Sequence, residues 1–255
     1  MKLELDKIYN MDCLEGMKLI TDKSIDCIIC DLPYGTTSCK WDSVIPFEPL
    51  WEQYKRIIKD SGAIVLFGSE PFSTELRHSN LKMYKYDWIW QKNTVDGFFN
   101  SKYRPLKTIE NISVFSKKQA RAKGDNMVYY PQGLIQINKK VIDKRKIDSD
   151  GHNYHRNSLD NKEYIQEYTN YPTEILKFDK DIPKLHPTQK PVALIEYLIK
   201  TYTNEGDIVL DNCMGSGTTA IAAINTNRHF IGFELNKDYY DIANKRIEEK
   251  KKEEE

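Results

Sequence analysis

Short apolar runs alternate with amphipathic segments over the first 116 residues of the chain. Four of these runs have the length and the aliphatic or aromatic content of strands. They are Ile25–Cys30, Ala63–Phe67, Tyr86–Gln91 and Asn111–Phe115. Between the first two, Phe47–Lys59 carries apolar residues at helical spacing. Strands that alternate with helices predict an α/β fold with a mostly parallel, doubly wound sheet.

A regular pattern returns after about Leu185. Pro191 is suited to the first turn of a helix, and apolar residues follow it at intervals of three to four. Beyond that helix, the pattern predicts a strand at Ile208–Leu210, a helix at Thr218–Thr226, a strand at His229–Phe233 and a final helix with Tyr240, Ala243 and Ile247 on one face. The last part of the chain therefore continues the same α/β architecture.

The stretch between these regular parts, residues 117–183, is rich in Asn, Asp, Lys and Tyr. Residues 117–147 contain nine Lys or Arg and two acidic residues. One interpretation is a solvated surface excursion. The other is an inserted nucleic-acid-binding region, in which basic side chains contact phosphates and tyrosines stack on bases. We therefore divide the chain into 1–116, 117–183 and 184–255, with the first and last segments forming one domain.

Composition restricts the class of protein further. The net charge is zero and five cysteines are present, an odd number that argues against a disulfide framework. The N-terminus lacks a signal-peptide pattern and no window is apolar enough to span a membrane, so we expect a cytoplasmic protein. Cys27 and Cys30 form a C-x-x-C motif, but positions three apart on a strand point to opposite faces. We therefore predict no metal site.

A glycine loop follows the predicted strand that ends at Leu210. Gly215 and Gly217 allow a sharp turn and a close approach of the backbone to a ligand. The next strand ends at Glu234, whose carboxylate is placed to accept hydrogen bonds from ribose hydroxyls. A plain strand-to-helix turn and a dinucleotide site are the alternatives. Asp211 argues against the latter because a carboxylate repels a pyrophosphate, whereas it suits an ammonium group or a ribose.

The segment Asp31-Leu32-Pro33-Tyr34 directly follows the predicted strand Ile25–Cys30. Ligands bind at the carboxyl ends of parallel strands, where this turn lies. An exocyclic amine on a nucleobase is a weak nucleophile, because its lone pair is delocalised into the ring. Two acceptors, the Asp31 side chain and the Leu32 carbonyl, would hold the amine N–H bonds out of the ring plane and free that lone pair. Tyr34 offers a flat face for an extruded base, and Pro33 stiffens the turn.

Asp31–Tyr34 resembles the D-P-P-Y signature of amino-group DNA methyltransferases, with Leu32 in place of the first proline. The glycine loop resembles the methionine-binding loop of S-adenosylmethionine methyltransferases. Other segments resemble parts of the same family. His186–Pro191 resembles its H-P-T-Q-K-P motif, and Met11–Glu15 resembles the segment beside the adenine ring of the cofactor. Gly62–Ser69 and Tyr86–Asn93 resemble strands that line the target-base pocket. Their order, with the catalytic half before the cofactor half, is similar to that of the beta group.

The resemblance implies a Rossmann-like S-adenosylmethionine methyltransferase fold with an inserted DNA-recognition region, acting on double-stranded DNA. The implied catalytic residues are Asp31, Leu32, Pro33 and Tyr34. The implied cofactor-binding residues are Asp12, Cys13, Asp31, Thr188, Lys190, Asp211, Cys213, Gly215, Gly217, Thr218, Thr219 and Glu234. Within that set, Asp12 is expected nearest the adenine ring, and Thr188 and Lys190 at the methionine carboxylate.

Adenine N6 is the expected methyl acceptor, because aspartate at position 31 is commoner in adenine enzymes and serine in cytosine-N4 enzymes. Cytosine N4 is the nearest alternative, and relatives with similar turns act on RNA or on protein glutamine amides. A catalytically silent DNA-binding partner is a further alternative, against which the intact Asp31 and Tyr34 argue. No cysteine has the Pro-Cys context of cytosine-C5 enzymes. Beta-group enzymes are often dimers, so a homodimer is also expected. The recognition sequence, and the choice between a restriction-modification companion and an orphan enzyme, stay open.

Overall fold

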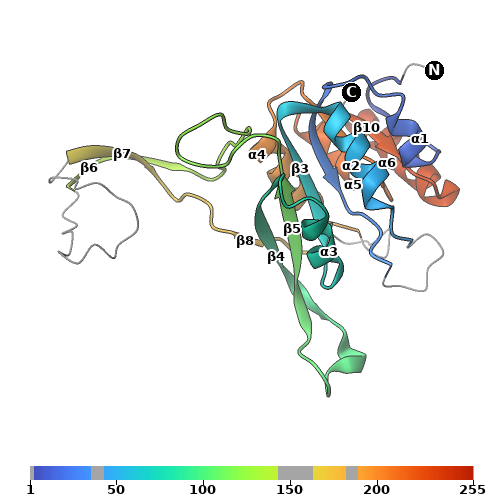
Figure 1. The fold of residues 1–255 in the computed structure, drawn as a ribbon, viewed down its shortest axis with the longest axis horizontal. Coiled ribbons are helices and arrows are strands. Elements are labelled where there is room, and N and C mark those ends of the chain that lie inside the picture. The colour runs from blue at the N-terminus through green and yellow to red at the C-terminus, as the bar shows by residue number, and fades with distance from the viewer. Residues whose placement is uncertain (1–2, 36–42, 143–162, 182–188, 255) are drawn as a thin grey trace. The chain divides into compact units, whose positions relative to one another are not determined.

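The computed structural model describes residues 3–35, 43–142, 163–181 and 189–254 (Figure 1). The chain separates into two compact units. The first contains residues 1–130 and 174–255, and the second contains residues 131–173. No helix within the described residues has the length and apolar character needed to cross a membrane.

An eight-stranded sheet forms the centre of the first unit, in the order β1-β10-β9-β2-β3-β5-β4-β8. In that order the strands are Lys7–Tyr9, His229–Phe233, Ile208–Asp211, Ile25–Cys30, Ile58–Gly68, Lys107–Phe115, Tyr84–Asp96 and Ile175–Lys177. Five of the seven neighbouring pairs are parallel, and β5 runs antiparallel to β3 and β4. The mostly parallel α/β sheet predicted from the sequence is therefore confirmed.

Helices cover both faces of this sheet and enclose a separate hydrophobic core on each. One face carries α1 (Cys13–Met17), α2 (Phe47–Ile57) and α3 (Phe72–Ser79), and the other carries α4 (Val192–Tyr202), α5 (Thr218–Asn225) and α6 (Lys237–Glu254). Cys27 belongs to the core under α4 and α5, whereas Cys30 belongs to the core under α1 and α2. The two cysteines thus point to opposite faces of β2, as their spacing predicted.

The predicted elements agree with the structure except at several ends. The helix predicted over 47–59 ends at Ile57, because Ile58 already has extended backbone and begins β3. The strands β1 and β8 and the helix α1 are only three to five residues long, too short for a periodic signal in the sequence. The helix α3 has eight residues and was also not predicted.

The segment 117–183 contains more regular structure than its composition indicated. The strands β6 (Ile135–Ile142) and β7 (Glu163–Thr169) pair antiparallel within the second unit. The flanks of the segment belong to the first unit, where the Tyr130 N–H donates to the Thr201 carbonyl at 2.8 Å and β8 joins the edge of the main sheet. The compact second unit is therefore shorter at both ends than the predicted insert.

Parallel pairing brings the chain segments after several strands to one edge of the sheet. Asp12 follows β1, Asp31 follows β2, the glycine loop follows β9, and Glu234 follows β10. Segments far apart in the sequence consequently meet there, and they form the candidate site.

Candidate active site

A cavity of about 850 Å³ opens at this edge of the sheet. Its volume lies within the roughly 300–1,000 Å³ that is typical of small-molecule sites. The predicted site residues that line it are Asp12, Cys13, Asp31, Leu32, Pro33, Tyr34, Lys190, Asp211, Cys213, Gly215, Thr218, Thr219 and Glu234. Gly217 is not among its lining residues, and Thr188 lies outside the described residues.

The glycine loop is held in shape by Asp211 at the end of β9. Its carboxylate accepts hydrogen bonds from the Cys213 N–H at 3.0 Å and from the Thr219 hydroxyl at 2.6 Å. Burial raises the pKa of Asp211 to about 6, although both hydrogen bonds favour the ionised form. Gly217 has φ of +83°, and a Cβ there would lie 3.0 Å from the Cβ of Ala243 in α6. Gly217 therefore lets the loop pack on α6, outside the lining of the cavity.

Glu234 braces the same loop from the end of β10. One carboxylate oxygen accepts from the Gly215 N–H at 2.8 Å, and the other accepts from the Asn236 N–H at 2.7 Å. Burial raises the pKa of Glu234 above its ordinary value. Each carboxylate oxygen has a further lone pair, so Glu234 can still accept from a ligand hydroxyl in the cavity.

Asp12 and two cysteines form the neighbouring wall. Asp12 caps α1 by accepting from the Leu14 N–H at 2.8 Å. The Asn212 amide nitrogen lies 3.6 Å from the sulfur of Cys13 and 3.6 Å from that of Cys213. The hydrogen bond with Cys213, together with burial, raises the pKa of the Cys13 thiol far above its ordinary value. This thiol is therefore neutral near pH 7 and is unsuited to attack a nucleobase ring.

Asp31 is the first residue of the predicted catalytic turn, Asp31–Tyr34, and both of its carboxylate oxygens accept hydrogen bonds. The Tyr34 hydroxyl donates to Oδ1 at 2.6 Å, and the Lys190 ammonium donates to Oδ2 at 2.5 Å. Burial and the charge of Asp31 raise the pKa of Tyr34 well above its ordinary value, so the phenol stays protonated as a donor. The Tyr34 ring stacks on Phe72, with centroids 4.9 Å apart and an interplanar angle of 28°. One face of the tyrosine is thereby backed by α3.

Lys190 also faces Glu110 of β5, whose carboxylate oxygen lies 3.6 Å from the ammonium. Its ammonium lies 5.1 Å from the ring centroid of Phe67. Burial alone would lower the pKa of Lys190, but the carboxylates of Asp31 and Glu110 outweigh it and raise that pKa. The role of Lys190 at the methionine carboxylate of a cofactor stays a prediction. In the structure its ammonium lies between two carboxylates of the protein, that of Asp31 directly after β2 and that of Glu110 in β5.

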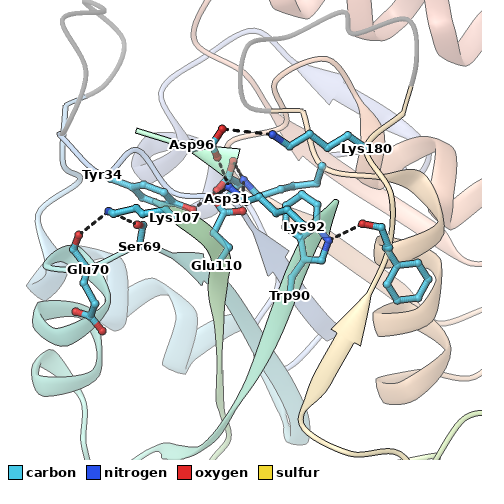
Figure 2. Close-up of polar contacts among 12 residues, drawn as sticks. Asp31, Tyr34, Ser69, Glu70, Trp90, Lys92, Asp96, Lys107, Glu110 and Lys180 are labelled. Carbon is cyan, nitrogen blue, oxygen red and sulfur yellow. Dashed lines mark hydrogen bonds and ion pairs between the residues drawn. The ribbon is translucent and has the colours of Figure 1, made fainter. Parts of the chain in front are cut away.

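The charged cluster continues from Glu110 of β5 to Lys92 and Asp96 of β4 (Figure 2). The Lys92 ammonium lies 3.5 Å from Glu110 and 2.8 Å from Asp96, and Lys180 lies 3.7 Å from Asp96. Only the resemblance of Tyr86–Asn93 to pocket-lining strands pointed to Lys92 in advance. Glu110 was missed, although a carboxylate directly before the predicted strand Asn111–Phe115 was an available signal.

The cavity thus presents two chemically different regions. Around the glycine loop, Asp12, Asp211 and Glu234 give an anionic lining that suits a ligand with hydroxyl donors and positive charge. Around the catalytic turn, the Asp31 carboxylate and an aromatic ring lie beside a buried cation. This second region fits a flat ring that carries an amine, because the carboxylate accepts N–H bonds and the ring stacks on Tyr34.

A family model described as DNA methylase matches residues 25–245, which include Asp31–Tyr34, the glycine loop and Glu234. The chain belongs to the DNA methylase family. The matched span also contains the second unit and the strands β3, β4 and β5.

Two curated relatives of this DNA methylase match it along most of their own length. The type II methyltransferase M1.MboII of Moraxella bovis is 29% identical, over 95% of this chain and 96% of that protein. The orphan methyltransferase M.BamHII of Bacillus amyloliquefaciens is 32% identical, over 89% of this chain and 90% of that protein.

Solved structures agree with this assignment. The crystal structure of the M1.HpyAVI–SAM complex shares 26% identity and a TM-score of 0.60, covering 94% of this chain and 98% of that chain. The cytosine-N4-specific PvuII DNA methyltransferase gives a TM-score of 0.64 at 15% identity, covering 98% of this chain and 92% of that one. Because the identity is so low, the comparison with the PvuII enzyme supports only the fold of this DNA methylase and not its target base.

Proposed function

We propose that this DNA methylase transfers a methyl group from S-adenosylmethionine to N6 of adenine in double-stranded DNA. The observation that carries the proposal is the Asp31 carboxylate, held in the cavity by the Tyr34 hydroxyl and the Lys190 ammonium. An aspartate at this position of the turn is typical of adenine enzymes. Cytosine N4 is the second candidate because it presents the same amine chemistry.

The residues of the catalytic turn act on the amine. Asp31 and the Leu32 carbonyl accept its two N–H bonds, which makes the nitrogen lone pair available. The base stacks on the face of Tyr34 away from Phe72, so the nitrogen is held in one orientation. When bound, S-adenosylmethionine supplies a methyl group on a positively charged sulfur that leaves as a neutral thioether. The nitrogen forms the new bond to carbon, sulfur keeps the electron pair of the broken bond, and the nitrogen then releases one proton to solvent.

The anionic region supports cofactor binding. Glu234 is the proposed partner of the ribose hydroxyls, because its carboxylate lines the cavity and keeps free lone pairs. Asp211 and Asp12 add negative charge near a cationic ligand, while the first turn of α5 offers backbone N–H groups at Thr218 and Thr219. Cys13 and Cys213 line the cavity and are the proposed contacts of the adenine ring of the cofactor.

Product analysis separates the candidates. The purified protein is incubated with unmethylated genomic DNA and methyl-labelled cofactor, and the digested nucleosides are resolved by mass spectrometry. We expect label in N6-methyladenine and none in N4-methylcytosine. Label in N4-methylcytosine alone overturns the choice of adenine but not the amine mechanism. No label in any nucleoside supports the catalytically silent partner.

The second unit is the proposed contact to the recognition sequence. Its described strands β6 and β7 expose Tyr164 and Tyr168, while its described charges, two lysines and two glutamates, are balanced. We also infer a homodimer that acts in the cytoplasm. Light scattering at two protein concentrations tests the dimer: a mass of one chain at both contradicts it.

A further inference from the structure

The connection between β4 and β5 in the first unit has a regular backbone structure (Figure 1). The ladder between the two strands closes with the pair Asp96 and Lys107, so residues 97–106 form the tip. Gly97 has φ of +88°, which glycine adopts readily, and it begins the short 3₁₀ helix η1 (Phe98–Asn100). The Asn100 carbonyl then accepts from the N–H groups of Tyr103 and Arg104. These backbone bonds give the tip a defined conformation.

Three large aromatic side chains on this tip are exposed to solvent. Phe99 is 99% exposed, Tyr103 87% and Phe98 73%. A phenylalanine left in water forgoes roughly 1.5–3 kcal/mol of burial energy, so two adjacent exposed phenylalanines with a nearby tyrosine point to a surface that is covered in a complex.

The same tip adjoins the cavity in which the base is methylated. Gly97, Arg104 and Lys107 line that cavity. The Lys107 ammonium donates to the Ser69 hydroxyl at 3.0 Å and to the Glu70 carbonyl at 3.3 Å, which fastens the base of the tip to the end of β3 (Figure 2). Residues 97–107 contain Lys102, Arg104 and Lys107 and no acidic residue. The exposed aromatic rings thus belong to a segment whose charged residues are all basic and which contributes residues to the cavity lining.

We propose that this tip is a wedge that enters the DNA duplex beside the target base. Phe99 stacks on the bases next to the position that the target base leaves, with Phe98 and Tyr103 flanking it, while Lys102 and Arg104 contact the phosphates. The wedge offsets part of the cost of unpairing and unstacking the target. The inference rests on the proposed function, because it requires DNA as the substrate and a base that leaves the duplex.

A second copy of this chain is a poorer occupant of the tip. A twofold dimer places the same patch of each copy against the other, so Lys102 and Arg104 would face their own equivalents. Three side chains on a narrow tip also bury far less than the roughly 800 Å² per partner of a stable interface. Duplex DNA offers phosphates to the basic side chains and base faces on which the aromatic rings can stack.

Variants at the tip test the wedge once the recognition site has been mapped by sequencing DNA methylated by the wild-type protein. Phe99→Ala is compared with Phe99→Trp, which retains a stacking ring, and with Leu81→Ala. Leu81 is 61% exposed and precedes β4 at the strand end opposite the tip. We expect Phe99→Ala to lower kcat/KM on a matched duplex by about 5- to 150-fold, the factor for stacking one base. Phe99→Trp and Leu81→Ala are expected to stay within about threefold.

A duplex with a mismatch opposite the target base distinguishes a wedge from general DNA affinity. Because the mismatched base leaves the helix at lower cost, the deficit of Phe99→Ala is expected to shrink to less than about threefold. An equal deficit on both duplexes overturns the wedge, and so does a normal kcat/KM on the matched duplex. Loss of a dimer in light scattering, with normal kcat/KM, assigns the tip to a second copy.

Failure of the proposed function is detected separately, by the methylated nucleosides that the wild-type protein produces. Label in N4-methylcytosine changes the target base but leaves the wedge test intact. If no methyl transfer occurs, the proposed function fails. The role of the tip is then tested by the Kd of wild-type protein and Phe99→Ala for plasmid DNA. In that case an unchanged Kd for Phe99→Ala overturns the tip as a DNA contact, and a weaker one supports it.

Discussion

The ammonium of Lys190 donates a hydrogen bond to the Asp31 carboxylate at 2.5 Å, although 159 positions separate the two residues in the sequence. Lys190 is only 6% exposed, and Glu110 is its second carboxylate neighbour. A buried cation between two carboxylates compensates their charges, and its hydrogen bond holds the Asp31 side chain in place. The position of the Asp31 carboxylate therefore depends on a side chain from the last segment of the chain.

Replacing Lys190 by methionine removes this cation but keeps the length of the side chain. Asp31 and Glu110 then lose the cation that compensates their charges, and Asp31 loses a hydrogen bond, so we expect kcat to fall by about 10- to 100-fold. Lys180→Met is the matched control, because Lys180 contacts only the outer end of the cluster at Asp96, at 3.7 Å. Steady-state rates of the two variants on one DNA substrate provide the measurement. A kcat of Lys190→Met that equals that of Lys180→Met contradicts the assigned role.

Asp31→Asn tests the acceptor directly. The amide has the shape of the carboxylate, but it carries no charge and presents N–H bonds in place of one acceptor oxygen. We expect kcat to fall by about 10²- to 10³-fold, comparable to the loss of one preorganised polar group at a reacting centre. Single-turnover methyl transfer measures the loss, and the Kd for cofactor shows whether binding survives. Near-normal transfer in this variant is incompatible with the mechanism.

The ring and the hydroxyl of Tyr34 have separable roles. Tyr34→Phe keeps the stack on Phe72 and removes only the 2.6 Å hydrogen bond to Asp31, so we expect kcat/KM within about tenfold of wild type. Tyr34→Ala also removes the stacking face and is expected to cost about 1–3 kcal/mol more. Comparing kcat/KM of the two variants on one DNA substrate checks the order. Equal losses would show that the ring does not hold the base.

Asp211 predicts a pH dependence of cofactor binding. Burial raises its pKa to about 6, so the carboxyl is neutral at pH 5 and charged at pH 7. A positively charged cofactor is therefore expected to bind more tightly as the pH rises through 6, by roughly tenfold, the effect of about 1.4 kcal/mol. Calorimetric titration at pH 5, 6 and 7 measures this change. Asp211→Asn should flatten the dependence, and a slope retained in that variant assigns it to another group.

The same shift has a consequence for folding. Because the pKa of Asp211 is higher in the folded state than its ordinary value, unfolded chains lose this proton first as the pH rises. The contribution of Asp211 to the free energy of unfolding therefore falls between about pH 4 and pH 6 and is constant above that window. Asp211→Asn removes this dependence from denaturation curves.

Gly217→Ala and Gly206→Ala form a matched pair of backbone variants. Both glycines have φ near +80°, but a Cβ at Gly206 meets no atom within 4 Å, whereas at Gly217 it meets Ala243 at 3.0 Å. Gly206→Ala is thus expected to cost about 1–2 kcal/mol for the left-handed backbone alone. Gly217→Ala should cost more and should also weaken cofactor binding, because the loop has to shift. Urea denaturation and the cofactor Kd measure the two effects. An equal loss of unfolding free energy in both variants would show that α6 shifts to accommodate the new methyl group without a measurable energetic cost.

Local patterns in the sequence predicted elements that are long and strongly periodic. The strand Ile25–Cys30 has the predicted bounds, and the opposite orientations of Cys27 and Cys30 followed from the two-residue repeat of a strand. The turn chemistry of Asp31–Tyr34 and the glycine loop are also local, because a few adjacent residues determine them. By contrast, β8 has three residues and is stabilised by pairing with β4, which no local pattern encodes.

The sequence by itself determined the order of the motifs, the α/β architecture and the expectation of amine methylation, because periodicity and turn chemistry act over neighbouring residues. Only the tertiary structure decided which charges meet. It placed Lys190 between Asp31 and Glu110, and it placed an exposed aromatic tip at the mouth of the cavity. These relationships depend on the order of strands in the sheet, which joins segments more than a hundred residues apart and follows from the burial of both faces at once.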